Sequence, residues 1–275
     1  MDAVRESARP ADDASAVRGG FDVGVLLPNS FGSALALRRA GIPERWGYGT
    51  DGRGPLLTRA ARVPPEVRGR SQVYYYRAML AGVGLRVTAT PDASLRCLPE
   101  WSAQADALLG APGPWIGLNP GAFFGTAKRW LPERYAAVGD LVARSTGARV
   151  AIVGGPGERA LGDTIAAGLR APARNLCGET TLGGMAGVLS RMAVVVTNDS
   201  GPMHVAAALG VPVVAVFGPT DERETGPVGD GHRIVREPVH CSPCGLRECP
   251  IDHRCMTRIG VDRVAAEARE ALARG

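Results

Sequence analysis

The stretch VVVTNDSGPMHVAAALGVPVVAVFG, residues 194–218, decides the fold of this chain. It holds two continuous apolar runs, at 194–197 and 213–217, and each run has the length of a buried strand. The residues at 202–209 have a helical pattern, and Pro202 stands where a first-turn proline belongs. Continuous apolar strands joined by a helix are typical of a parallel sheet that is covered on both faces. The stretch therefore predicts one strand–helix–strand unit of an α/β domain.

The same alternation runs through the chain from residue 112 onward. We expect strands at 115–119, 149–153, 194–197 and 213–217, with a weaker one at 174–177. We expect helices at 132–145, 158–168, 182–191 and 202–209, and a closing helix at 261–275. This pattern predicts a doubly wound, Rossmann-like domain at 112–260.

The first part of the chain is less regular. A strand is predicted at 21–27 and helices at 33–40 and 73–81, while the polar, Gly- and Pro-containing residues 47–70 predict a long surface loop. One strand cannot form a sheet, so the region 21–111 is predicted to be an incomplete domain or to pair with another chain. Residues 1–20 are predicted to be poorly ordered or a remnant segment.

Composition and charge exclude several classes of protein. The formal charge of +5 comes from Arg residues scattered singly, without the run of like charges found in nucleic-acid-binding tails, so we expect no nucleic acid partner. The longest apolar stretch, 206–217, is too short to span a membrane and is broken by Gly210 and Pro212. Residues 1–20 lack the apolar core of a secretory signal, so we expect a cytoplasmic protein with reduced cysteines.

The strongest chemical signal is NDSGPMH, residues 198–204. A strand delivers it to the start of a helix, where free backbone amides bind phosphate. Gly201 lets the backbone approach a ligand, Ser200 can cap the helix or donate to an oxygen, and His204 returns to the same face after one turn. The Asp199 carboxylate is a good acceptor for sugar hydroxyls. The alternative interpretation is an Asp/Ser helix cap with a surface histidine.

A second loop, NPGAFFGTAKRW at 119–130, follows the first strand of the regular domain. Ligands meet open parallel sheets at this position, so Lys128 is predicted to contact a diphosphate, with Thr126 as a further contact. The alternative is a solvated Lys128–Arg129 pair. Trp130 is predicted to be a packing residue.

A third loop, VGGPGE at 153–158, also stands at a strand end. Glu158 could accept hydrogen bonds from ribose hydroxyls, or it could be an acidic residue favoured by the helix dipole. The loop lacks the dinucleotide spacing, so NAD is not expected. Because the three loops converge on one edge of one sheet, we predict a ligand that contains a diphosphate.

Cysteine and histidine gather in residues 240–255, which include Cys241, Cys244, Cys249 and Cys255. Four such ligands could hold a structural zinc ion, although the spacing matches no standard finger. We expect reduced thiols or a structural bridge rather than zinc. Outside this segment, Cys97 and Cys177 are predicted to be core residues.

Four segments together resemble a known family. They are LLPNSFGSALALRRAGIPERWGYGTDGRG (26–54), NPGAFFGTAKRW (119–130), VGGPGE (153–158) and NDSGPMHVAAALGVPVVAVFGPTD (198–221). They resemble the heptosyltransferases that build the inner core of lipopolysaccharide, and the second type in particular.

The resemblance implies an α/β fold of the GT-B type with two Rossmann-like domains, the N-terminal one incomplete here. It implies that Lys128, Asp199, Ser200, Gly201 and His204 hold ADP-heptose, with Thr126 and Glu158 beside them. The acceptor, a lipid-linked lipopolysaccharide core, would meet the N-terminal domain at Asn29 and Ser30, and the protein could contact the inner membrane peripherally. Transfer in the family is inverting and uses neither a metal nor another cofactor.

Some departures from the family pattern bear on activity. The resemblance places the carboxylate general base upstream of Met1, so no catalytic base is assigned in this chain. Gly32 and Phe123 stand where the family often has a basic residue and an acidic or small residue, respectively. The alternatives to heptose transfer are a catalytically silent nucleotide-sugar binder and a GT-B transferase that uses another nucleotide sugar.

Overall fold

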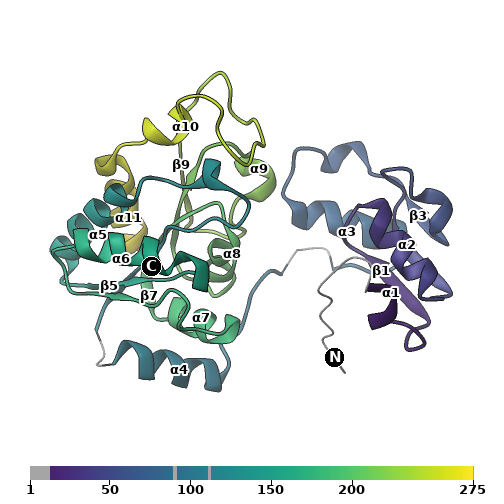
Figure 1. Cartoon of the computed structure of the whole chain (residues 1–275), viewed down its shortest axis with the longest axis horizontal. Helices are drawn as coiled ribbons and strands as arrows, with labels where there is room; N and C mark the ends of the chain where they lie inside the picture. The colour runs from purple at the N-terminus through teal and green to yellow at the C-terminus, as the bar shows by residue number, and fades with distance from the viewer. Residues whose placement is uncertain (1–12, 89–91, 111–112, 275) are drawn as a thin grey trace. The chain divides into compact units, whose positions relative to one another are not determined.

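The computed structural model describes residues 13–88, 92–110 and 113–274. The chain divides into two compact units, Met1–Pro91 and Asp92–Gly275 (Figure 1). Each unit has a parallel sheet with helices beside it. None of the helices formed by the described residues combines the length and the apolar character that crossing a bilayer requires.

The second unit is built on a six-stranded parallel sheet. Its strands are β4 (Trp115–Asn119), β5 (Arg149–Ile152), β6 (Ala173–Asn175), β7 (Met192–Asn198), β8 (Val213–Phe217) and β9 (Arg233–Arg236). Their order in the sheet is β6-β5-β4-β7-β8-β9. The chain moves outward from β4 through β5 to β6 and then returns to the other side of β4 with β7. The gap between the carboxyl ends of β4 and β7 is therefore the topological switch point, where ligands bind in such folds.

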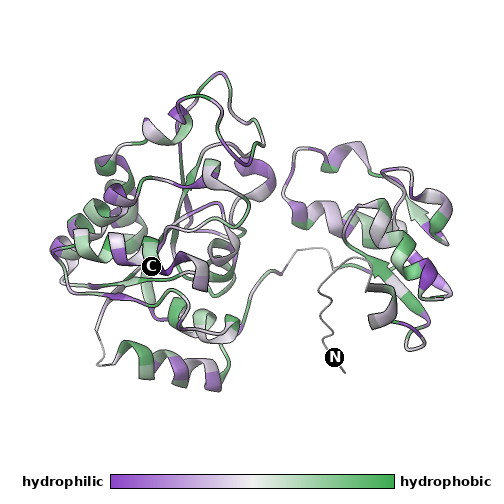
Figure 2. Ribbon diagram, viewed as in Figure 1, coloured by the Kyte–Doolittle hydropathy of each residue, from purple (hydrophilic) through white to green (hydrophobic). Residues whose placement is uncertain are grey.

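Helices cover both faces of this sheet, as the continuous apolar strands predict. They are α4 (Pro99–Leu109), α5 (Pro132–Thr146), α6 (Arg159–Gly168), α7 (Leu182–Leu189), α8 (Gly201–Ala208), α9 (Glu222–Thr225), α10 (Arg254–Thr257) and α11 (Val261–Arg274). Ile116 and Leu118 of β4 belong to the core under α5 and α11, while Trp115 belongs to the core under α4, α7 and α8. In Figure 2 the turns of α4 alternate between apolar and polar colours, as expected of a helix with one buried face.

The predicted strands and helices of this unit are confirmed to within a few residues, but four elements were missed: the short helices α9 and α10, strand β9 and helix α4. Strand β9 reads Arg-Ile-Val-Arg and is an edge strand with a single fully buried residue, so it lacks a long apolar run. Helix α4 packs against α7, because Gly187 lets the two backbones approach; a Cβ at Gly187 would lie 2.0 Å from the carbonyl oxygen of Trp101. The division at Pro91 thus places α4 in the second unit, whereas the predicted boundary lay at 111/112.

The first unit holds a three-stranded parallel sheet, which corrects the prediction of a single strand. Its strands, in sheet order, are β1 (Val23–Leu26), β2 (Glu44–Tyr48) and β3 (Arg59–Ala61). Its helices are α1 (Asp13–Ala16), α2 (Phe31–Arg39) and α3 (Gln72–Gly82), and 3-10 turns lie at Gly54–Leu56 and Pro65–Val67. The predicted surface loop at 47–70 is also wrong, since it contains the end of β2, all of β3 and both 3-10 turns. These strands were missed because ERWGY and RAA are short and polar.

The prediction for residues 1–20 lies partly outside the described residues. From residue 13 the chain forms α1, and Ala14 is buried against Ala40 and Ile42. Residues 13–20 are therefore partly packed against α2, contrary to the expectation of a poorly ordered segment.

Candidate functional site

A pocket of about 660 Å³ opens at the carboxyl ends of β4, β5 and β7 in the second unit. A cavity of this volume lies in the usual range for small-molecule sites. Its lining comes from all three predicted loops and from the start of α7: Asn119, Gly121, Ala122, Phe123, Arg129, Gly154, Gly155, Pro156, Gly157, Glu158, Thr180, Thr181, Leu182, Met185, Ser200, Gly201 and Pro202. The structure therefore brings together the three loops that the sequence singled out.

The N-terminal end of α8 forms one wall of the pocket. Ser200 is the N-cap residue, but its hydroxyl donates to Oδ1 of Asn119 at 2.7 Å and makes no side-chain cap hydrogen bond. The amides of the first turn are thus not satisfied by the Ser200 side chain. A Cβ at Gly201 would meet no other atom within 4 Å, so the backbone there is open. This wall has the geometry of an anion site.

Lys128 and Asp199 form an ion pair beside the pocket rather than in its lining. Nζ of Lys128 lies 2.6 Å from Oδ2 of Asp199, and the two side chains are only 12% and 5% exposed. The hydroxyls of Thr220 and Thr225 donate to the same oxygen at 2.7 and 3.2 Å. Three donors therefore hold the Asp199 carboxylate in one orientation, and Asp199 in turn holds the ammonium group of Lys128.

Lys128 is the single lysine of the chain, since every other residue among the 32 Lys and Arg residues is Arg. An ammonium group is a compact point charge on a flexible stem, whereas guanidinium is a planar fork. A chain that uses Arg everywhere else thus has its one lysine beside the predicted anion site.

The pKa of His204 responds to both charges of this pair. Burial of part of the ring lowers the pKa of His204, the carboxylate of Asp199 opposes this shift, and Lys128 adds to it. His204 is nevertheless exposed to solvent. Thr126, also predicted as a ligand contact, opens the 3-10 turn Thr126–Lys128 and is exposed.

Two buried asparagines connect the loops around the switch point. The amide of Asn198 donates to the carbonyl oxygens of Pro120 at 2.7 Å and Gly121 at 3.2 Å. Its Oδ1 accepts from the backbone of Trp130 at 3.0 Å and the hydroxyl of Tyr135 at 2.9 Å. Asn198 therefore holds both ends of the 119–130 loop.

Asn119 likewise connects the end of β4 to the loops at 153–158 and 198–204. It donates to the carbonyl oxygen of Val153 at 3.0 Å and accepts from the hydroxyls of Thr197 and Ser200. Trp130 is 1% exposed and its indole donates to the carbonyl oxygen of Ile259, which confirms its prediction as a packing residue.

Glu158 and Arg129 are the charged side chains that line the pocket itself. Oε2 of Glu158 accepts from the amide of Gly155 at 2.8 Å. A Cβ at Gly121 would lie 1.8 Å from Oε1 of Glu158, so glycine at 121 makes room for the carboxylate. Nε of Arg129 is buried and has no hydrogen-bond partner among the described residues. The sequence singled out Lys128 of this pair, whereas Arg129 is the one that faces the pocket.

The cysteines of residues 240–255 remain free thiols. Within the described part of the chain, no three or more His, Cys, Asp or Glu side chains are arranged to hold a metal ion. Burial, together with the neighbouring thiols of Cys249, Cys241 and Cys244, raises the pKa of Cys255 to about 11. Elsewhere, Cys177 is buried as predicted, but Cys97 is only partly buried.

The predicted acceptor-side residues belong to the first unit. Ser30 caps α2 by accepting from the amide of Ser33 at 3.2 Å, as expected of an N-cap. The side chain of Asn29 accepts from the fully buried Arg53 at 3.0 Å and donates to the hydroxyl of Tyr75 at 2.8 Å. Both residues are thus fixed by neighbours within their own unit.

Comparison with known proteins places these features in a family. The model of Glycosyltransferase family 9 (heptosyltransferase) matches residues 14–254. Lipopolysaccharide heptosyltransferase 2 of Escherichia coli K12 is 35% identical over an alignment of 228 positions, and the alignment covers 78% of this chain and 65% of that relative. The chain thus spans slightly less than two thirds of the relative's length.

Solved structures agree with this result. The structure of E. coli ADP-heptose lps heptosyltransferase II has a TM-score of 0.76 and 31% identity, covering 92% of this chain and 77% of that one. A family 9 glycosyl transferase from Veillonella parvula has a TM-score of 0.82 over 97% of this chain and 79% of its own, and at 23% identity it supports the fold alone. The predicted α/β class of the GT-B type is confirmed. Since the family model spans most of the chain and the solved E. coli heptosyltransferase II is 31% identical, the chain belongs to glycosyltransferase family 9, the heptosyltransferase family.

Proposed function

We propose that this protein transfers a heptose from ADP-heptose to the inner core of lipopolysaccharide, with inversion and without a metal ion. The observation that carries the proposal is the pocket at the β4/β7 switch point, with the start of α8 on one wall and the Lys128–Asp199 pair beside it. Family membership supplies the class of reaction. The pairing of a cation with a held carboxylate suits a ligand that carries both phosphate and sugar hydroxyls.

In this proposal the nucleotide lies in the pocket and its diphosphate reaches the start of α8. The negative charge that develops on the leaving ADP would be stabilised by Lys128 and by the free amides of Ser200 and Gly201. Asp199 would accept hydrogen bonds from the sugar, and Glu158 from the ribose. His204 would lie at the same end of the site.

The acceptor is proposed to be the lipid-linked core, with Asn29 and Ser30 on the acceptor side. Because the acceptor is a lipid, we propose that the protein works at the cytoplasmic face of the inner membrane through peripheral contact.

Binding of ADP tests the donor half of this proposal. A ligand at about 100 times its Kd stabilises a folded protein by about 2.7 kcal/mol. For a unit of this size we expect the midpoint of thermal unfolding to rise by about 5 to 10 °C. Lys128→Ala should abolish most of this rise and Lys128→Arg should restore part of it, while Arg144→Ala, which removes an exposed charge from the last turn of α5, should leave it unchanged.

The single lysine offers an independent measurement. Lys128 carries the one side-chain amine, so acylation followed by peptide mass spectrometry reports on this residue alone. ADP should slow its acylation. The proposal is wrong if neither ADP nor ADP-heptose changes unfolding or labelling of the wild-type protein. Formation of a heptosylated core by the wild-type protein would distinguish transfer from silent binding, and a comparison of nucleotide sugars would identify the donor.

A further inference from the structure

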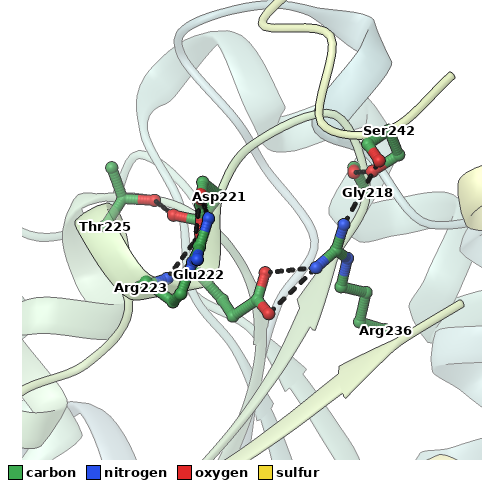
Figure 3. Close-up of polar contacts among 7 residues, drawn as sticks. All are labelled: Gly218, Asp221, Glu222, Arg223, Thr225, Arg236 and Ser242. Carbon is green, nitrogen blue, oxygen red and sulfur yellow. Dashed lines mark hydrogen bonds and ion pairs between the residues drawn. The ribbon is translucent and has the colours of Figure 1, made fainter. Parts of the chain in front are cut away.

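The segment 240–253, here named the cysteine loop, is anchored firmly at its start. Arg236 of β9 makes two hydrogen bonds of 3.0 Å to the carboxylate of Glu222 in α9 and a third, of 3.3 Å, to the carbonyl oxygen of Ser242 (Figure 3). The hydroxyl of Ser242 donates to the carbonyl oxygen of Gly218 at 2.5 Å. Two further amides, those of Cys244 and Gly245, donate to the carbonyl oxygen of Pro219. The loop is therefore fixed to the carboxyl end of β8.

The cysteine loop also docks on the segment that carries Lys128. The amide of Ala127 donates to the carbonyl oxygen of Arg247 at 2.9 Å, and Nε2 of His253 lies 2.7 Å from the carbonyl oxygen of Ala127, to which it can donate. A Cβ at Gly125 would lie 2.2 Å from the same oxygen of Arg247, so only glycine permits this approach. The backbone of Arg247 is thus held against the segment 125–127.

This docking brings the side chain of Arg247 near Lys128. The guanidinium carbon of Arg247 and Nζ of Lys128 each lie 5.0 Å from the ring centroid of Phe124, so they are no more than about twice that distance apart. Both contacts have the geometry of cation–π interactions. The Arg247 side chain is exposed, and no carboxylate among the described residues forms an ion pair with it.

The charges around Lys128 show why a second cation matters. Asp199 balances the charge of Lys128, and the start of α8 contributes only about half of a positive charge. A nucleoside diphosphate carries at least two negative charges. Arg129 and Glu158, the charged side chains of the pocket lining, offset each other, so the groups around Lys128 leave most of the charge of the diphosphate unbalanced. Arg247 supplies a full positive charge beside them.

We propose that Arg247 is a second cation of the donor site, which binds the diphosphate oxygens of the nucleotide together with Lys128. The proposal rests on the proposed function and gives the anchoring of the cysteine loop a role: the loop is held at Ser242 and at the carbonyl oxygen of Arg247, so the backbone of Arg247 is fixed next to the segment that carries Lys128. Phe124 contacts both cations.

Isothermal titration of the full chain with ADP, AMP and adenosine tests this role. We expect Arg247→Ala to weaken ADP binding by about 5-fold, as the loss of one charge-assisted contact at an exposed site predicts. The loss should be smaller for AMP and absent for adenosine. Arg247→Lys should restore most of the affinity, and Arg258→Ala, which removes another exposed arginine of the C-terminal region, should change nothing.

The salt dependence supplies a readout that a purely structural role would not move. Removing a cation that contacts the ligand should make the decrease of ADP affinity with rising NaCl concentration less steep. An ADP affinity within twofold of wild type in Arg247→Ala, or an equal loss for adenosine, overturns the inference while leaving the proposed function intact. A wild-type protein that does not bind ADP overturns both.

Discussion

Replacing Asn198 by Ala should destabilise the second unit far more than an ordinary asparagine substitution. The Asn198 side chain is fully buried and makes four hydrogen bonds to the 119–130 loop and α5. The substitution leaves the amide of Trp130 and the carbonyl oxygens of Pro120 and Gly121 without this partner. The hydroxyl of Tyr135 keeps a second acceptor, the carbonyl oxygen of Asn119, at 3.2 Å.

The magnitude follows from these three groups. A buried polar group that loses its partner costs about 1 to 3 kcal/mol, and water that enters the vacated space would satisfy part of the loss. We therefore expect the free energy of unfolding to fall by about 3 to 5 kcal/mol in total. For a unit of this size, that corresponds to a decrease of about 6 to 20 °C in the unfolding midpoint.

Thermal unfolding and urea titration would measure this change, and Asn175→Ala provides the matched control. Asn175 also ends a strand and makes hydrogen bonds to Arg159, Asp163 and Cys177, but it is only partly buried. Its replacement should cost about 1 kcal/mol or less. A midpoint for Asn198→Ala within 2 °C of the control, on the order of the effect of 1 kcal/mol, would refute the reasoning that Asn198 holds the loop.

Two further predictions concern the glycines and the thiols of the second unit. Gly125→Ala forces a Cβ against the backbone of Arg247 and should lower the free energy of unfolding by about 1 to 3 kcal/mol. A Cβ at Gly201 meets no atom within 4 Å, so Gly201→Ala should weaken ADP binding without changing the free energy of unfolding. Burial raises the pKa values of Cys177 and Cys255 to about 12 and about 11, so at pH 8 these thiols stay protonated and should resist iodoacetamide while the exposed Cys244 reacts. Peptide mass spectrometry checks the order of labelling, and rapid labelling of Cys177 in the folded protein would contradict the assignment.

The sheet of the second unit could be predicted from sequence because its strands are buried on both faces. Strands β4 and β8 are fully buried, so their residues form the continuous apolar runs that signal such a sheet. The loops that follow these runs could be identified for the same reason, since the end of an apolar run marks the edge of the sheet. This reasoning located Lys128, Glu158 and the start of α8 on one edge.

The first unit shows where the pattern fails. In β2, Arg45 donates from its side chain to the carbonyl oxygens of Leu56 and Ile42, and Trp46 donates to Glu44. When the polar side chains of a strand form hydrogen bonds within their own unit, the sequence of that strand has the polar pattern that is typical of a loop. The alternation of apolar and polar residues contains no information about such partners, because it records only the polarity of each residue and not the hydrogen bonds that its side chain makes.

The same limit applies to the site. Thr220 and Thr225 hold Asp199 from positions more than twenty residues along the chain, so only the folded structure shows that they meet. Asn119 and Asn198 do stand in the predicted loops, directly after apolar runs. A buried amide at a strand end was therefore the one available signal that these positions connect the loops.

Asn198 and Asp199, at the end of β7, have different roles, and this difference limits which ligands the site can bind. Asn198 uses its whole side chain to hold the 119–130 loop, whereas the next residue, Asp199, has one oxygen held by Lys128, Thr220 and Thr225. A carboxylate fixed in this way repels further phosphate but accepts hydrogen bonds from hydroxyl groups. A ligand gains most when its phosphates end at the start of α8 and a group that carries hydroxyls follows them. A nucleotide sugar has this order of groups, while a nucleoside triphosphate would place its last phosphate against the carboxylate.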